Sequence, residues 1–300
     1  MELDKRVNGT TKLTGLLGNP VEHTVSPFLH NTLFNMMGLN GIYIPMKPDR
    51  RSLGDAVAGL KAAGFAGFNV TIPFKEAILE YLDESSEEVR ILGTANTVHI
   101  KNGRLIGHNT DGHGFVRAFE RQTGTSLKGK DVCVLGAGGT AKALAVKISI
   151  EGASRICIIN RTRSKADEIA EYINTGLKSV LESNASAFTA AAGSDEARNV
   201  LEQFDVIINT TSVGMHPDIN SSPLMDDIRF LSKPIVYDVI YNPAETVLLK
   251  YAASKGCRAV NGAGMLFYQG LRAFEIWMDV RVPENDADEL LTEFLKYLTV

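Results

Sequence analysis

A lysine stands just beyond a short apolar strand whose last residues are polar. Pro73 ends the strand because proline cannot donate a hydrogen bond to a ladder, and we expect Lys75 to open a helix over residues 75–82. A lysine at a helix N-terminus opposes the helix dipole, so its position needs another explanation. Asn69 and Thr71 alternate along the same strand. Together these residues predict a ligand site beyond the carboxyl end of an α/β sheet, where such folds bind small molecules.

A glycine-rich turn lies between a predicted strand and a predicted helix. Its sequence, G-A-G-G-T-A, fits the G-x-G-x-x-G/A pattern and begins with Gly136, Ala137, Gly138 and Gly139. Glycines there permit a tight turn and let a pyrophosphate approach the helix N-terminus, which stabilises its charge. The alternative is a strand–helix turn that binds no ligand. The strand before the turn and the strand after the helix favour the dinucleotide site.

The next predicted strand ends in cations where an NAD-binding chain usually carries a carboxylate. After Asn160 the chain offers Arg161, Arg163 and Lys165. These cations suit a 2′-phosphate, so we expect NADP rather than NAD. The alternative is a solvated basic helix start, in which Thr162 simply caps the helix and Arg163 faces water.

Asp111 follows a predicted hairpin, whose turn is Asn102-Gly103, and precedes a predicted helix. From this segment alone, an ordinary N-cap is the simpler interpretation of Asp111. His108, Asp111 and His113 also match an HxxDxH spacing of metal ligands. The sequence contains no further ligand cluster and no evident Ser-His-Asp arrangement, so we expect no metal.

Two later segments could complete a cleft. Helix initiation explains Asn242 as a cap and Pro243 at the first position, and it leaves Tyr241 free to face a cleft. Residues 261–269 predict a glycine hinge that enters an apolar helix. Gln269 is either an ordinary polar helix position or a group that reaches back into a site between domains.

Composition limits the classes of protein to consider. With 300 residues and 44% hydrophobic content, the chain can bury a large core, and its length favours two domains. A net charge of -4 gives no basic surface, which disfavours a nucleic-acid partner. Three cysteines without a CxxC predict buried free thiols in a reducing cytoplasm. The charged N-terminus does not predict a secretory signal, and no apolar run reaches the ~20 residues that span a bilayer.

Short apolar runs alternate with helical patterns along the chain, which predicts α/β architecture with largely parallel sheets. Ser26 followed by Pro27 predicts a helix start with serine as the N-cap. The segment 174–203 is rich in Ser and Ala and weakly patterned, so we expect a variable helix or a loop insertion there. The predicted strands are 13–18, 42–46, 67–72, 96–100, 105–107, 131–135, 155–160, 205–209, 235–239 and 258–260, and the predicted helices include 26–37, 52–63, 139–151, 164–172, 244–255, 265–278 and 286–298.

Taken in order, these segments resemble the shikimate dehydrogenase family, including its shikimate/quinate dehydrogenase branch, over essentially the whole chain. The resemblance rests on motifs at residues 18–20, 23–27, 69–75, 95–98, 109–112, 136–141, 160–162, 238–243 and 264–269. It implies an N-terminal three-layer αβα substrate domain, a Rossmann-type dinucleotide-binding domain, and C-terminal helices that return to the first domain. We therefore expect residues 1–110, completed by 263–300, to bind substrate and residues 111–262 to bind NADP.

The resemblance also implies a reaction and the residues that perform it. The reaction is the reversible NADPH-dependent reduction of 3-dehydroshikimate to shikimate, a step of chorismate and aromatic amino acid biosynthesis. Lys75 and Asp111 would form the catalytic pair, and Tyr241 would approach the substrate carboxylate. The other implied substrate residues are Thr24 and Ser26 at the carboxylate, and Asn69, Thr71, Asn96 and Gln269 at the ring hydroxyls. The implied cofactor residues are Gly136, Ala137, Gly138, Gly139, Asn160, Arg161, Thr162, Lys165, Gly262 and Met265.

Thr24 departs from the family, which more often has serine at this position. Its methyl group crowds the carboxylate subsite, and quinate carries an extra hydroxyl near its carboxylate, so the departure mildly disfavours quinate. Three alternatives stay open: a quinate/shikimate dehydrogenase that uses NAD and NADP, a non-catalytic NADP-binding regulator, and an S-adenosylmethionine methyltransferase. A regulator should lack the Lys75/Asp111 pair, and a methyltransferase usually needs an acidic residue near Asn160. We expect a small-molecule substrate, no nucleic-acid or membrane partner, a cytoplasmic location, and either a monomer or a homodimer.

Overall fold

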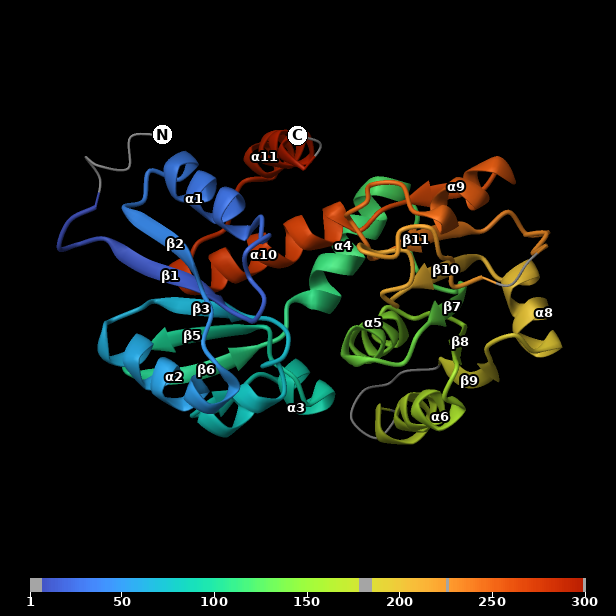
Figure 1. Cartoon of the computed structure of the whole chain (residues 1–300), viewed down its shortest axis with the longest axis horizontal. Helices are drawn as coiled ribbons and strands as arrows, with labels where there is room; N and C mark the ends of the chain where they lie inside the picture. The colour runs from blue at the N-terminus through green and yellow to red at the C-terminus, as the bar shows by residue number, and fades with distance from the viewer. Residues whose placement is uncertain (1–6, 178–184, 225–226, 299–300) are drawn as a thin grey trace. The chain divides into compact units, whose positions relative to one another are not determined.

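Two sheets organise the chain, and each has six strands within residues 7–177, 185–224 and 227–298, which the computed structural model describes (Figure 1). The chain divides into two compact units with one sheet each. Unit 1 comprises Met1–Thr110 and Phe267–Val300, and unit 2 comprises Asp111–Leu266. None of the helices in the described part of the chain combines the length and the apolar content that a membrane span requires.

The sheet of unit 1 combines a parallel half with an antiparallel half. Its strands follow the order β2 (Gly41–Met46), β1 (Lys12–Leu17), β3 (Gly67–Val70), β5 (Thr97–Lys101), β6 (Arg104–His108) and β4 (Glu84–Ser85). β1 pairs in parallel with β2 and β3, whereas β5 is antiparallel to both β3 and β6. The hairpin turn between β5 and β6 is confirmed, because Asn102 and Gly103 adopt left-handed φ angles of 53° and 72°.

Helices cover both faces of this sheet, as Figure 1 shows. Successive residues of β1 point to opposite faces. Accordingly, Leu16 packs with Tyr43 and Trp277, while Leu17 packs with Phe68 in a second apolar cluster. Both faces of the sheet are therefore buried, which confirms the three-layer αβα arrangement. The helices are α1 (Ser26–Met36), η2 (Arg50–Ser52), α2 (Leu53–Ala62), η3 (Ala77–Tyr81), α3 (Glu87–Leu92), α10 (Ala263–Met278, which begins in unit 2) and α11 (Glu284–Tyr297).

The prediction that Lys75 opens a helix over residues 75–82 is wrong. Lys75 lies in a turn, and only the short 3₁₀ helix η3 follows it. The Lys75 carbonyl accepts the Ala95 N–H at 2.9 Å, so the neighbouring loop takes the bond that an α-helix would need. The argument from the helix dipole therefore loses its basis for Lys75.

Two predicted N-caps are also wrong. Ser26 is the first helical residue of α1, and no side chain caps that helix. α9 (Val247–Ser254) begins later than predicted, because Thr246 rather than Asn242 caps it. The Thr246 hydroxyl accepts a backbone N–H of the first turn at 3.3 Å. Tyr241 consequently lies in a loop outside the helix.

The sheet of unit 2 is parallel throughout and has the Rossmann strand order. Its strands follow the order β12 (Arg258–Val260), β11 (Ile235–Asp238), β10 (Val206–Asn209), β7 (Asp131–Leu135), β8 (Arg155–Asn160) and β9 (Ser186–Ala191). The order reverses between β7 and β10, and such folds bind dinucleotides at this point of reversal. The other helices of unit 2 are α4 (Asp111–Thr123), α5 (Gly139–Ile150), α6 (Arg163–Glu171), η4 (Tyr172–Leu177) and α8 (Asp195–Gln203).

The segment 174–203 is not the variable insertion that we predicted. It contains β9, which pairs with β8 in parallel, and α8, whose apolar residues pack into the core of unit 2. The pattern was weak because β9 is an edge strand of mostly small residues, S-A-F-T-A-A, in which polar and apolar positions differ little. β9 ends beside Asn160, so this segment borders a predicted cofactor residue. Within the segment, residues 178–184 lie outside the described residues.

Candidate functional site

The polar ends of three strands of unit 1 meet at one edge of its sheet. Antiparallel pairing places Thr97, the first residue of β5, opposite both Asn69 near the end of β3 and His108 at the end of β6. Asn96 precedes β5 and Thr110 follows β6, so the same register brings their side chains to this edge. Residues that are distant in sequence thus become neighbours.

A continuous set of hydrogen bonds joins these side chains into the polar network, which comprises Asn69, Asn96, Thr97, Thr110 and Gln269. Asn69 Nδ2 donates to Thr97 Oγ1 at 3.1 Å, and Thr97 Oγ1 donates to Asn96 Oδ1 at 3.1 Å. The Thr110 N–H donates to the same Oδ1 at 2.8 Å. Asn96 Nδ2 donates to Thr110 Oγ1 at 3.0 Å and to Gln269 Oε1 at 3.4 Å. Because these groups bond one another, their donors and acceptors have fixed directions, which suits a polyhydroxylated ligand.

A buried aromatic pair supports the polar network. Tyr43 Oη donates to Asn69 Oδ1 at 2.9 Å. The His30 ring stacks on Tyr43, with centroids 4.2 Å apart. Burial lowers the pKa of His30 to about 3, and the nearby Asn69 side chain opposes this shift, although neither ring nitrogen has a hydrogen-bond partner among the described residues. His30 is therefore neutral near pH 7, and burial raises the pKa of Tyr43, which keeps its proton.

Backbone hydrogen bonds fix the segments that carry the other predicted substrate residues of unit 1. The Ser26 N–H donates to Thr24 Oγ1 at 3.3 Å at the start of α1. The Thr71 N–H donates to the last carbonyl of β1 at 2.9 Å. Lys75 is half-buried, and its carbonyl bond to Ala95 ties its turn to the segment that begins the polar network.

The glycine-rich turn of unit 2 has the geometry of a dinucleotide site. Gly136 follows β7 with a left-handed φ of 108°, and a Cβ there would lie 2.8 Å from Thr210 Oγ1. Gly138 and Gly139 face open space, since a Cβ at either would meet no atom within 4 Å, and Ala137 between the glycines is half-buried. Among the described residues, no side chain caps α5, so its first N–H groups are free to bind an anion. These features fit a pyrophosphate.

β8 ends in an exposed basic segment. The Asn160 Nδ2 donates to the carbonyl two residues further on at 2.9 Å, which folds the loop before α6. Arg161, Thr162 and Lys165 are exposed, whereas Arg163 approaches a carboxylate of its own helix at 3.8 Å. The exposed cations fit a 2′-phosphate in charge and donor number.

A buried carboxylate organises the loop after β11. Asp238 accepts hydrogen bonds from Asn209 Nδ2 at 3.0 Å and from the Thr246 hydroxyl at 2.7 Å. Burial raises the pKa of Asp238, and these hydrogen bonds oppose the shift. Asp238 thereby joins the ends of β10 and β11 to the cap of α9.

The same loop carries Tyr241, which is half-buried and whose pKa burial raises. Gly262 approaches this loop closely: its N–H donates to the Ile240 carbonyl at 3.1 Å. A Cβ at Gly262 would lie 2.0 Å from the Val239 carbonyl oxygen, so this approach requires glycine. Met265 is buried in the first turn of α10.

Asp111 is the first residue of α4 and is only 7% exposed. α4 packs closely on α5, since a Cβ at Gly112 would lie 2.9 Å from Lys147 Cβ. Asp111 therefore belongs to unit 2, whereas Lys75 belongs to unit 1. In the described part of the chain, no group of three or more His, Cys, Asp and Glu side chains could hold a metal, so the HxxDxH spacing assembles no metal site there.

Comparison with known proteins shows which family the chain resembles. Residues 16–98 match the family model of the shikimate dehydrogenase substrate binding domain. Residues 118–228 match the model of shikimate / quinate 5-dehydrogenase, and residues 262–290 match that of the shikimate 5'-dehydrogenase C-terminal domain. A shikimate dehydrogenase (NADP(+)) from Alkaliphilus oremlandii is 42% identical over 278 residues, which cover 92% of this chain and 95% of the relative. The chain belongs to the shikimate dehydrogenase family.

Other members of the family resemble the chain over nearly its whole length. The shikimate dehydrogenase (NADP(+)) of Geobacillus kaustophilus is 42% identical and covers 95% of this chain and 99% of its own. The crystal structure of shikimate 5-dehydrogenase from Listeria monocytogenes, in complex with shikimate and NAD, superposes with a TM-score of 0.86 at 34% identity, covering 97% of this chain and 100% of that one. Quinate dehydrogenase from Corynebacterium glutamicum, in complex with NAD, superposes with a TM-score of 0.84 at 29% identity, covering 95% and 99%. The α/β fold with a substrate domain and a Rossmann-type domain is therefore confirmed.

Sequence reasoning missed the residues that hold the polar network in place. Tyr43 and His30 lie in segments whose patterns predict only a strand and a helix, and a buried tyrosine or histidine there resembles ordinary core. One feature of the sequence could have indicated Thr97 and Thr110, because each is the direct chain neighbour of a predicted site residue. Their shared hydrogen bonds depend on strand register, which no local pattern reveals.

Proposed function

We propose that the protein is an NADP-dependent shikimate dehydrogenase, which reversibly reduces 3-dehydroshikimate to shikimate. The observation that carries the proposal is the polar network of unit 1, whose fixed amides and hydroxyls suit a small ring with several hydroxyl groups. The names of the relatives with about 40% identity, each a shikimate dehydrogenase (NADP(+)), support the same substrate and cofactor.

The proposed catalytic pair is Lys75 and Asp111. NADPH supplies the hydride when it is bound. Reduction of a ketone builds negative charge on its oxygen, so a proton donor within hydrogen-bond reach is required. In this proposal the Lys75 ammonium gives that proton, and the Asp111 carboxylate orients both the lysine and the substrate hydroxyl.

The remaining roles divide between the two units. We propose that unit 1, essentially residues 1–110 completed by 263–300, binds substrate, and that residues 111–262 bind NADP. In unit 1, Thr24 and Ser26 would hydrogen-bond the substrate carboxylate, while Asn69, Thr71, Asn96 and Gln269 would hold its hydroxyls, with Tyr241 of unit 2 at the carboxylate end. The proposed cofactor residues are Gly136, Ala137, Gly138 and Gly139 at the pyrophosphate, Asn160, Arg161, Thr162 and Lys165 at the ribose phosphate, and Gly262 and Met265.

A quinate/shikimate dehydrogenase that also uses NAD is the second candidate. The similarity to the quinate dehydrogenase of Corynebacterium glutamicum favours it, and the methyl group of Thr24 mildly opposes it. The deciding experiment is a four-way assay of shikimate and quinate with NADP⁺ and NAD⁺, with kcat/KM measured for each pair. The proposed function requires shikimate with NADP⁺ to give the highest value. Absence of turnover with all four pairs would contradict both candidates.

Replacement of Lys75 separates an enzyme from a non-catalytic NADP-binding regulator. We expect Lys75→Ala to lower kcat about 10²- to 10⁴-fold, the usual share of general acid–base catalysis, while NADP⁺ binds as before. Calorimetry measures the NADP⁺ affinity. Lys61→Ala, which alters an exposed lysine of α2, serves as the matched control and should keep full activity. Undiminished turnover in Lys75→Ala would exclude the proposed role of Lys75.

We further propose a cytoplasmic location, which the buried free thiols of Cys133, Cys157 and Cys257 support, because thiols stay reduced there. Cys133 and Cys157 are direct partners on β7 and β8, and they are free. A homodimer is proposed from the resemblance to the family, and sedimentation velocity tests it.

A further inference from the structure

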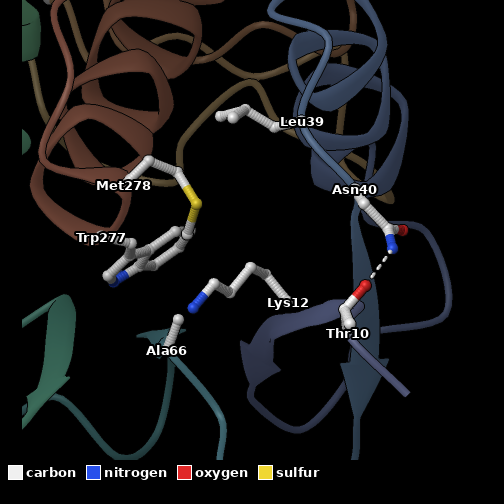
Figure 2. A pocket seen from close by; sticks show the side chains of 7 residues that line it. All are labelled: Thr10, Lys12, Leu39, Asn40, Ala66, Trp277 and Met278. Atoms are coloured by element: carbon white, nitrogen blue, oxygen red, sulfur yellow. Dashed lines mark hydrogen bonds between the residues drawn. The ribbon is translucent and has the colours of Figure 1, made fainter. Parts of the chain in front are cut away.

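A cavity of about 310 Å³ lies at the amino ends of the parallel strands of unit 1 (Figure 2). Lys12 begins β1, and Asn40 and Ala66 directly precede β2 and β3. The polar network lies at the opposite end of β3, so the cavity is separate from the proposed substrate site. The complete lining is Thr10, Lys12, Leu39, Asn40, Ala66, Trp277 and Met278.

The walls of this cavity are fixed by bonds within unit 1. Trp277 Nε1 donates to the Val98 carbonyl at 2.9 Å, so the indole uses its polar atom inside the protein, and the 4% of the residue that stays exposed lines the cavity. Gly67 permits this position, because a Cβ there would lie 2.2 Å from the indole. On the opposite rim, Asn40 Nδ2 donates to Thr10 Oγ1 at 3.2 Å (Figure 2). A cavity that is already formed spares a ligand the cost of ordering its walls.

Lys12 gives this apolar cavity a positive charge. Figure 2 shows its side chain reaching across the cavity, with the ammonium toward Ala66 and the Trp277 indole. Among the described residues, no carboxylate forms an ion pair with Lys12, and Asp279, which follows Met278 in the chain, approaches Lys101 at 3.8 Å. A flat apolar wall beside one cation suits a planar apolar group with one acidic substituent. The volume is at the lower end of the range for ligand cavities, so a single ring fits.

We propose that this cavity binds a small monocyclic aromatic carboxylate, with its ring against Trp277 and Met278 and its carboxylate on the Lys12 ammonium. The proposal concerns a second site and does not depend on the proposed function. Burial of the ring supplies most of the affinity, since an exposed ion pair adds only a few-fold.

The chain contains one tryptophan, Trp277, which lines this cavity, so its fluorescence should respond to a ligand that binds there. The probe is 3-phenylpropanoate, whose phenyl group does not absorb the light that excites tryptophan selectively. Titration of the full-length protein should change the Trp277 emission in a saturable way, with a Kd of roughly 0.1–1 mM for so small a ligand. Saturating shikimate should leave this Kd unchanged, because it occupies a different site.

Two controls test the charge. The neutral 3-phenylpropanamide should bind the unaltered protein at least about threefold more weakly than the carboxylate, and Lys12→Gln should weaken the carboxylate to a similar degree, as loss of a partly exposed ion pair predicts. Lys61→Gln, an exposed lysine of the same unit outside the cavity, should leave the Kd unchanged. The proposal is overturned by a lack of saturable change up to about 10 mM, by equal binding of the amide, or by displacement with shikimate. The amide comparison needs no variant, so it holds even where Lys12→Gln fails to fold.

Discussion

At the scale of single residues, the hydroxyl of Tyr43 holds one end of the polar network. Asn69 has its Nδ2 atom bonded to Thr97, and its Oδ1 atom accepts from Tyr43 Oη. An amide that is fixed at both ends presents its remaining hydrogen-bonding capacity in one direction. We therefore regard Tyr43 as a positioning residue, which acts on substrate through Asn69.

Tyr43→Phe removes this one hydroxyl and keeps the ring that stacks on His30. Loss of a buried hydrogen bond costs about 1 kcal/mol, so we expect the KM for shikimate to rise roughly three- to tenfold while the KM for NADP⁺ stays unchanged. Steady-state kinetics with each substrate varied in turn measures both. Tyr251→Phe is the matched control, because Tyr251 Oη also donates one hydrogen bond, to the Ile228 carbonyl at 2.8 Å in unit 2. A similar rise of the shikimate KM in both variants would contradict a positioning role.

Arg161→Ala tests the preference for NADP. Loss of one charge-assisted hydrogen bond to a phosphate costs about 1.5–3 kcal/mol, so the KM for NADP⁺ should rise roughly 10- to 100-fold. The KM for NAD⁺ should change little, because NAD⁺ lacks the 2′-phosphate. Arg163→Ala, whose guanidinium approaches Asp167 at 3.8 Å, is the control and should affect both cofactors alike. Equal effects of Arg161→Ala on both cofactors would remove Arg161 from the phosphate site.

At the scale of helices and strands, Lys75 and Thr246 illustrate how tertiary bonds move element boundaries. β3 ends at Val70, three residues before Pro73, and the Ala95 N–H bonds the Lys75 carbonyl, so a turn replaced the predicted helix. Asn242 and Pro243 form a good local helix start, yet Thr246 caps α9 because its hydroxyl also donates to the buried Asp238. Local helix propensity could not choose between these caps, since the deciding bond is to Asp238, which lies outside the helix at the end of β11.

Thr246→Ala removes the cap of α9 and one donor to Asp238. A lost cap costs about 1 kcal/mol, and a buried acceptor left without a donor costs about 1–3 kcal/mol, so we expect the free energy of unfolding to fall by roughly 2–4 kcal/mol. Chemical denaturation measures the change. Thr246→Ser keeps the hydroxyl and should lose less than about 1 kcal/mol as the price of one methyl group. Equal losses in the two variants would show that the hydroxyl has no part in the effect.

At the scale of the whole molecule, buried ionisable groups make stability depend on pH. Burial holds the pKa of His30 at about 3, below the value of 6.5 expected for an unfolded chain. Below pH 6.5 the unfolded chain takes up a proton at this histidine and the folded protein does not. The stability contributed by neutral His30 is thus complete above about pH 6.5 and is lost as the pH falls toward 3, at about 1.4 kcal/mol per pH unit.

His30→Leu keeps a side chain of similar size and removes the titration. Between pH 6 and pH 4 we expect the free energy of unfolding of the unaltered protein to fall about 2.5 kcal/mol more than that of the variant. Denaturation at several pH values gives the slope of the unfolding free energy against pH for each protein. The difference between the two slopes isolates the contribution of His30 from those of the carboxylates and the other histidines. Parallel slopes would mean that His30 is protonated in the folded protein or exposed to water.

The sequence by itself determined the residue types and the fold class. Three local patterns are present in the structure as predicted. They are the glycine-rich turn between a strand and a helix, the basic segment at the end of β8, and the alternation of strands with helices. Local sequence suffices for these features, because each depends on residue types and hydrophobic periodicity within a few turns of chain. The edge strand β9 escaped prediction because its residues are small and carry little periodicity.

Only the tertiary structure decided which of those residues bond one another. The polar network depends on the register of β3, β5 and β6. Asn69 of this network is held by Tyr43, which lies on the edge strand β2, separated from β3 by β1. The cavity of Lys12 and Trp277 joins the first strand to the end of α10, far away in the chain. Such contacts arise from the packing of distant segments, whose free energy no short stretch of sequence contains.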